Sequence, residues 1–212
     1  KNKKEPVTSI IGGSKVSTKI NVLLNLIKNV NNLIIVGAMA NNFLKFKGFN
    51  VGLSLLEKGA EKIINDIYAV AEKNNCNIII PVDCIVSNNL NGSPKYKSIN
   101  EIISEDMVLD IGKKTVDLIN KTVENSKTVF WNGPAGYFEN KNFSNGTIAI
   151  AKKIGENTQS KSLISIVGGG DTLAAIKNTD YQKLFTHLST AGGAFLESLE
   201  GKQLPGVKVL TN

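Results

Sequence analysis

Runs of Val, Ile and Leu alternate along the chain with stretches in which apolar residues recur at helical spacing. The runs are continuous and lack the polar residue at every second position that is typical of a strand with one solvent-facing side. Buried strands that are separated by helices form parallel sheets through right-handed crossovers. The predicted strands lie at residues 7–11, 33–37, 77–81, 107–112, 128–133, 163–168 and 185–189.

The stretches between these runs predict helices on both faces of the sheet. The fold class is therefore α/β, a doubly wound, Rossmann-like three-layer sandwich with a parallel sheet of about six strands. Residues 87–104, rich in Asn and Ser, are expected to form a looser connection. Helices are expected from about Lys15, from about Met39, within residues 55–74, after each of the strands at 107–112, 128–133 and 163–168, and finally to about Glu200.

Composition argues against several classes of protein as the function of this chain. None of the apolar runs in the 212 residues approaches the ~20 residues of a membrane span, so we predict a soluble protein. The formal net charge of +7 comes from lysines scattered over predicted helix faces, without a dense basic tract interleaved with aromatics. This pattern argues against nucleic-acid binding and favours anionic small molecules as ligands.

The chain has two cysteines and a single histidine. Cys76 and Cys84 do not form a Cys-x-x-Cys pair, and a thiolate or imidazole metal site is therefore not expected. We predict that both thiols are buried, reduced and inert, as in a cytoplasmic protein. His187 lies within a predicted strand and is expected to be a packed structural residue.

The segment Gly168-Gly169-Gly170-Asp171-Thr172 joins a predicted strand to a helix. In such sheets ligands bind at the carboxyl ends of the strands. Glycines at this position allow backbone N–H groups to approach an anion, and the helix N-terminus adds positive potential. Asp171 would repel a bare phosphate, so its carboxylate either caps the helix or holds Mg²⁺ against a bound polyphosphate.

Three other junctions have unusual residues. In IIGGSKVSTKI, Lys15 and Lys19 follow two glycines, although the spacing is not that of a Walker P-loop. In FWNGPAGYFE, a stiff loop follows a strand, and Glu139 is either a ribose ligand or a solvated surface acid. In HLSTAGGAFLE, small residues open the last helix in the manner of a second phosphate site.

Taken together and in this order, the junctions resemble the carboxyl-terminal, nucleotide-binding lobe of phosphoglycerate kinase. The resemblance covers essentially the whole chain. The motifs on which it rests are GGSKVSTK, GAMANNFL, IIIPVD, WNGPAGYFE, GGGDT, STAGGA and LEGKQLPGV.

The resemblance implies a role for each matching position. Lys15 would neutralise the transferring phosphoryl group, Lys19 would bind a second phosphate, and Asp171 would hold Mg²⁺ of the nucleotide. Gly192 and Gly193 would cradle the moving phosphoryl group with their backbone N–H groups. The remaining ligand positions implied are Asn132, Pro134 and Gly136 in the loop by the phosphates and base, Glu139 on the ribose, Gly168, Gly169, Gly170 and Thr172 on the phosphates, and Gly13, Gly37, Ala38, Leu55, Leu109 and Tyr137 around the adenine.

The chain departs from the family pattern at four positions. Val36 and Val108 stand where glycines are frequent, and both are expected to narrow the adenine slot. Asn42 replaces a threonine, and Ala191 replaces the first glycine of the STGGGA pattern, while the two glycines after it remain.

The resemblance also defines the expected function. We predict a single nucleotide-binding domain, residues 1–212, in which residues 1–6 end an interlobe connection and residues 203–212 return toward an amino-terminal lobe. Mg-ADP and Mg-ATP are the expected ligands, for reversible phosphoryl transfer between 1,3-bisphosphoglycerate and ADP in glycolysis. The chain is expected to be a monomer. Without the lobe that brings 3-phosphoglycerate, it is expected to bind nucleotide but to have negligible kinase activity.

Two other classes of protein remain as alternatives. A dinucleotide-dependent oxidoreductase uses a similar sheet, but it requires G-x-G-x-x-G after the first strand, where this chain has GGSKVS. A non-catalytic Rossmann-like nucleotide-binding module is the second alternative. The presence of Lys15, Lys19 and Asp171 argues against it, because a module without chemistry has little use for a metal-binding acid.

Overall fold

The computed structural model describes residues 4–160, 162–191 and 201. Its main sheet has six parallel strands in the order β3-β2-β1-β7-β8-β9, which confirms the predicted α/β fold. The chain builds β1, β2 and β3 outward in one direction and then returns to place β7 on the other side of β1. The strands are β1 (Val7–Ile11), β2 (Asn32–Ile35), β3 (Asn77–Ile79), β7 (Thr128–Asn132), β8 (Ile164–Gly168) and β9 (His187–Ser189).

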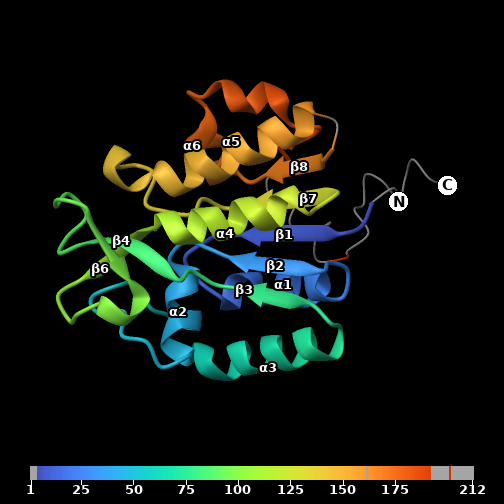
Figure 1. Cartoon of the computed structure of the whole chain (residues 1–212). Coiled ribbons are helices and arrows are strands. Elements are labelled where there is room, and N and C mark those ends of the chain that lie inside the picture. Colours follow the sequence, from blue (N-terminus) through green and yellow to red (C-terminus); the bar gives the residue numbers. More distant parts are fainter. Residues whose placement is uncertain (1–3, 161, 192–200, 202–212) are drawn as a thin grey trace.

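Helices cover both faces of this sheet (Figure 1). One apolar core joins one face to α1, α2 and α3, and a second core joins the other face to α4, α5 and α6. Within β1, Ile11 belongs to the first core and Ile10 to the second, as the alternation of strand side chains requires. The helices are α1 (Ile20–Ile27), α2 (Met39–Phe46), α3 (Ala60–Lys73), α4 (Lys113–Glu124), α5 (Asn145–Gln159) and α6 (Gly170–Ile176).

A second, antiparallel sheet of three strands was not predicted from the sequence. It consists of β4 (Asp83–Ser87), flanked by β5 (Lys95–Ser98) and β6 (Met107–Ile111). The apolar run at 107–112 is therefore a strand, but it belongs to this sheet and not to the parallel one. In Figure 1 the small sheet lies beyond the carboxyl ends of the parallel strands.

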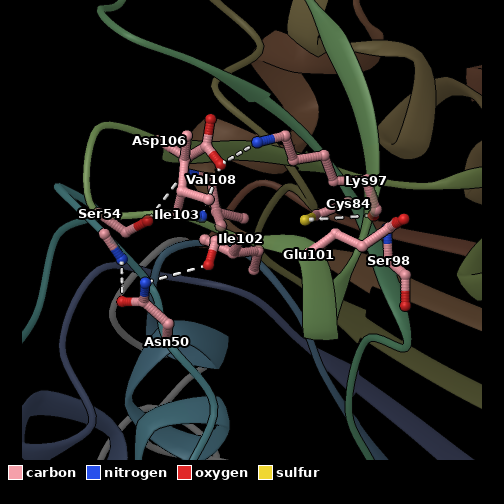
Figure 2. Close-up of polar contacts among 11 residues, drawn as sticks. Asn50, Ser54, Cys84, Lys97, Ser98, Glu101, Ile102, Ile103, Asp106 and Val108 are labelled. Atoms are coloured by element: carbon pink, nitrogen blue, oxygen red, sulfur yellow. Dashed lines mark hydrogen bonds and ion pairs between the residues drawn. The ribbon is translucent and has the colours of Figure 1, made fainter.

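Polar contacts hold the small sheet in place (Figure 2). The Lys97 ammonium donates to the Asp106 carboxylate at 2.6 Å, which ties β5 to the start of β6. The Ser54 hydroxyl accepts from the Val108 N–H at 2.8 Å and so connects β6 to the loop before α3. At the other end, the buried Asp83 carboxylate accepts from the N–H groups of Lys114 and Thr115 and thus caps α4.

Two local predictions are wrong. Helix α1 does not begin near Lys15, because the Glu57 carboxylate binds the backbone N–H groups of Val16 and Ser17 and a short 3₁₀ helix intervenes at Ser17–Lys19. His187 is exposed, since β9 is at the edge of the sheet. The helix expected to end near Glu200 lies outside the described residues.

Within the described residues, no helix is both long and apolar enough to cross a lipid bilayer.

Candidate functional site

A cavity of about 270 Å³ lies where the parallel strands end and the small sheet begins. The chain reverses direction across the sheet between β1 and β7, and this switch point is where doubly wound sheets bind ligands. The residues that follow β1, β2 and β7 line one wall of the cavity, and β6 lines the opposite wall. The predicted site residues in this lining are Gly13, Gly37, Ala38, Leu55, Leu109, Pro134, Gly136, Tyr137, Glu139 and Asp171.

Glycines let the chain segments after β1 and β7 touch. The Gly12 N–H donates to the Asn132 carbonyl at 2.8 Å, and Gly133 has a φ of 99°. A Cβ on Gly12 would lie 2.3 Å from the Pro134 carbonyl oxygen, and a Cβ on Gly133 would lie 2.4 Å from that of Gly12. The two loops can therefore lie against each other only because neither residue has a side chain.

Lys19 turns inward beneath these loops. Its ammonium group donates to the Gly12 carbonyl at 2.5 Å and to the Asn132 Oδ1 at 2.7 Å. Burial lowers the pKa of Lys19 to about 8, and the negative charge of Asp171 offsets only part of that effect. An ammonium group has three N–H donors, so one remains beyond these two bonds.

Asn132 and Thr172 make hydrogen bonds that connect the ends of β7 and β8. The Asn132 Nδ2 donates to the Gly168 carbonyl at 2.9 Å, which ties the end of β7 to the end of β8. The Thr172 hydroxyl accepts from the Gly133 N–H at 2.6 Å and is fully buried. The Thr172 hydroxyl fixes the loop after β7 in this way, and its expected contact with phosphates stays a prediction.

Asp171 lies in the first turn of α6 and does not cap it. The residue before the helix is Gly169, which has no side chain, and no side-chain hydrogen bond caps α6. The Asp171 side chain is exposed and lines the cavity. Gly170 is exposed beside it, with open space where a Cβ would be. Of the two readings of Asp171, the structure therefore contradicts the helix cap and leaves its carboxylate available at the mouth of the site.

Apolar side chains also line the cavity. Leu109 and Tyr137 line it together with Val108, the residue that was expected to narrow this slot. Leu55 is more than half exposed and forms part of the rim. Val36 was also expected to narrow the slot, but it is fully buried in the second core, and that expectation is wrong. Glu139 is exposed at the rim.

Asp110 is a member of the cavity wall that sequence reasoning missed. It is 2% exposed, and its carboxylate accepts from the N–H groups of Ile111 and Gly146 at 2.8 Å each. Burial raises the pKa of Asp110 to about 7, even though the two N–H groups favour the charged form. An acid inside the apolar run MVLDIG was the available signal, because carboxylates are seldom fully buried without partners.

Among the described residues, seven predicted site residues do not line the cavity: Lys15, Lys19, Asn132, Gly168, Gly169, Gly170 and Thr172. Lys15 is exposed. Its positive charge favours the ionised form of the Glu57 carboxyl group, which anchors the loop after β1. Gly192 and Gly193 lie outside the described residues. Cys84 lines the cavity unexpectedly, but burial raises the pKa of its thiol to about 12, and both cysteines are free and buried as predicted.

Comparisons with known proteins identify the family. The family model for phosphoglycerate kinase matches residues 1–202. The chain is 45% identical over 207 residues to the phosphoglycerate kinase of Zymomonas mobilis, which covers 97% of this chain and 52% of that protein. It is also 45% identical over 211 residues to the enzyme of Rhizobium meliloti, which covers 99% of this chain and 53% of that protein.

Solved structures agree with this relationship. The phosphoglycerate kinase of Coxiella burnetii superimposes with a TM-score of 0.93 at 41% identity over 99% of this chain and 54% of that one. The Pyrococcus horikoshii enzyme superimposes with a TM-score of 0.78 at 26% identity, over 98% of this chain and 52% of that one. The chain thus spans about half the length of the relatives that it matches. On the family match and these similarities, the chain belongs to the phosphoglycerate kinase family.

Proposed function

We propose that the chain is the nucleotide-binding domain of a phosphoglycerate kinase and that its cavity binds Mg-ADP and Mg-ATP. The observation that supports this most directly is the polarity of the cavity. Its lining includes the carboxylate of Asp171, just after the glycine-rich end of β8, together with apolar surface from Leu109 and Tyr137. A nucleotide has the same division between a charged polyphosphate and a flat, largely apolar base.

At the polar end, the donors present fit a magnesium nucleotide. The described residues contain no group of three or more His, Cys, Asp or Glu that could hold a metal ion unaided. Mg²⁺ is commonly held by one or two carboxylates together with substrate phosphates, and Asp171 would supply the carboxylate. When bound, the metal would neutralise charge on the phosphates. Lys15 and Lys19 would add positive charge, and the backbone of Gly168, Gly169 and Gly170 would approach the phosphates.

At the other end, we propose that the adenosine lies between two walls. Gly13, Gly37 and Ala38 would contact one face of the base, and Leu55, Leu109 and Tyr137 would contact the other. Glu139 is exposed at the rim, where its carboxylate would accept from the ribose hydroxyls. Asn132 ends β7, and Pro134 and Gly136 belong to the loop that follows it and leads to Glu139; all three would act by fixing the shape of that loop.

The proposed reaction is reversible transfer of a phosphoryl group between 1,3-bisphosphoglycerate and ADP, a step of glycolysis. Phosphoryl transfer depends on positioning both substrates. This chain spans about half the length of its relatives, and we propose that a separate amino-terminal lobe brings the second substrate. The free, buried thiols fit a cytoplasmic protein, and we propose a monomer.

The 212-residue chain by itself is expected to show negligible kinase activity while it binds nucleotide. The test is a coupled assay of ATP formation from 1,3-bisphosphoglycerate, run beside a nucleotide titration of the same preparation. Binding without turnover supports the proposal. Turnover near that of a full-length relative would contradict the need for a second substrate-binding region.

The affinity for Mg-ADP is expected to fall as the pH rises through about 8, the pKa of Lys19 in the unliganded chain. A bound phosphate favours the charged ammonium group and raises the pKa of Lys19, so that binding above this pH takes up a proton. Calorimetry in buffers of different ionisation enthalpy measures that uptake. Lys19→Arg should flatten the dependence because a guanidinium stays protonated. An unchanged profile in this variant would show that another group is responsible.

A further inference from the structure

Three Asn-Gly pairs occur in the chain, and the fold gives each of them a different environment. They are Asn91-Gly92, Asn132-Gly133 and Asn145-Gly146. An asparagine that precedes glycine is prone to deamidation, because no side chain hinders the attack of the glycine nitrogen on the asparagine amide. The attack requires a main chain that can rearrange and a glycine N–H that can leave its hydrogen bond. The environment of each pair therefore determines whether it reacts.

The pair Asn132-Gly133 is held by hydrogen bonds on all sides. The Asn132 Oδ1 accepts from the Lys19 ammonium at 2.7 Å, and the Asn132 Nδ2 donates to the Gly168 carbonyl at 2.9 Å. The Gly133 N–H donates to the Thr172 hydroxyl at 2.6 Å, and Asn132 is 3% exposed. Neither the amide that would be attacked nor the nitrogen that would attack it is free to move.

The pair Asn145-Gly146 begins α5 and is protected by the start of that helix. Asn145 is exposed, but Gly146 is buried, and its N–H donates to the Asp110 carboxylate at 2.8 Å. A Cβ on Gly146 would lie 2.4 Å from the Asp110 Oδ1, so the main chain is closely packed at this point. The Gly146 nitrogen can turn toward the Asn145 side chain only if the first turn of α5 unwinds.

The pair Asn91-Gly92 lies in the loop between β4 and β5 and lacks this protection. Residues 88–91 are all exposed, and the Asn91 side chain makes no hydrogen bond to any described residue. The Gly92 N–H donates to the Asn89 carbonyl at 3.3 Å, a longer bond than the N–H groups of Gly133 and Gly146 make. Both the amide and the attacking nitrogen are therefore available here.

We propose that Asn91 is a site of spontaneous deamidation and that the fold preserves the other two Asn-Gly pairs. The Gly92 nitrogen loses its proton to solvent and bonds to the side-chain carbonyl carbon of Asn91. The amide nitrogen of Asn91 takes up a proton and leaves as ammonia. Water then opens the succinimide ring at either carbonyl, which yields an aspartyl or an isoaspartyl residue. Both products are negatively charged at neutral pH.

The modification changes a loop that belongs to the cavity wall. Leu90, the residue before Asn91, lines the cavity, and its carbonyl accepts from the Asn140 Nδ2 at 2.9 Å. In the isoaspartyl product the main chain at position 91 passes through one additional carbon. Aged molecules therefore differ from fresh ones in charge and in main-chain length directly beside this contact.

The experiment is a time course of the 212-residue chain in mildly alkaline buffer, with the three pairs followed by peptide mapping. Mass spectrometry detects the replacement of NH₂ by OH, and a protein isoaspartyl methyltransferase labels the isoaspartyl product. In the native chain, Asn91 should deamidate at least about tenfold faster than Asn132 and Asn145, because those pairs must first break a buried hydrogen bond. Reaction of Asn132 or Asn145 at the rate of Asn91 would overturn the proposal.

The same time course in urea is the matched control, because unfolding removes the differences between the three environments. The three rates should then become similar. If Asn91 reacted in urea but stayed intact in the native chain, the loop would be protective and the proposal would be wrong.

Asn91→Gln tests the assignment to this residue, because a glutamine closes its larger ring more slowly. The change is made at Asn91 since a Cβ on Gly92 would lie 2.3 Å from the Ser87 Oγ. The variant should lose the native signal, and a signal that persisted would assign the modification to another residue. None of these outcomes depends on nucleotide binding, so they test this inference separately from the proposed function.

Discussion

Gly133→Ala is expected to lower the free energy of unfolding by about 3 kcal/mol, the sum of a strained backbone and an overpacked contact. Gly133 has a φ of 99°, and an added Cβ would lie 2.4 Å from the Gly12 carbonyl oxygen. The loop after β7 would have to move away from the loop after β1. That movement would also break the bond from the Gly133 N–H to the Thr172 hydroxyl. Urea unfolding followed by circular dichroism measures the loss.

Gly48→Ala is the matched control because it has the backbone strain of a positive φ without a steric clash of the added Cβ. Gly48 has a φ of 90°, yet nothing lies within 4 Å of the position that its Cβ would take. This variant should lose only about 1 kcal/mol, the cost of a left-handed backbone. Similar losses in the two variants would mean that the loops after β1 and β7 do not depend on their close contact.

Asp171→Asn is expected to weaken Mg-ADP binding by between ten- and a hundredfold. The reason is that the amide cannot replace a carboxylate as the anionic ligand of Mg²⁺, and interactions with a charged partner contribute about 1.5–3 kcal/mol. Without magnesium, Asp171→Asn should bind ADP more tightly than the unaltered chain does, because the variant no longer repels the phosphates. Calorimetric titrations with ADP, with magnesium and with chelator, measure both effects.

Asp180→Asn makes the same change of charge at an exposed acid that does not line the cavity. It should leave the affinity for Mg-ADP and its dependence on magnesium unchanged. If Asp171→Asn weakened ADP binding equally with and without the metal, its effect would be structural and the proposed metal role would be wrong.

The parallel sheet was predictable because its strands are buried on both faces and therefore appear as runs rich in Val, Ile and Leu, even though Thr8, Ser9 and Ser165 are also buried within them. Ile10 and Ile11 point to different cores, so apolar side chains are favoured at both positions. The antiparallel sheet had no comparable signal. Strand β5, with the sequence KYKS, is short and largely exposed, and β6 is apolar like the parallel strands although it pairs elsewhere.

The positions of the site were predictable to the extent that they follow strand ends. Gly13, Gly37, Pro134 and Asp171 all line one cavity, because parallel strands bring their carboxyl ends to the same edge. What each side chain does there depends on contacts between distant segments. Thr172 bonds the loop after β7 rather than facing the cavity, and no local pattern indicates which of these a threonine will do.

The buried polar residues of the cavity were not predictable for a related reason. Asp110 and Asn41 differ from surface residues of the same types only in what packs around them. Asp110 is enclosed because α5 begins against it, and Asn41 is enclosed because the loop at Leu55 folds over α2. Sequence reasoning identified strand ends that line the cavity but not the polar groups that other elements bury beside them.

The most direct test of the account is a calorimetric titration of the 212-residue chain with ADP, in the presence and absence of magnesium. If the strand ends that line the cavity, Gly13 by the base and Asp171 by the phosphates, form one nucleotide site, binding should saturate at a single ADP per chain and tighten when the metal is added. No binding at millimolar ADP, or binding that magnesium leaves unchanged, would contradict it.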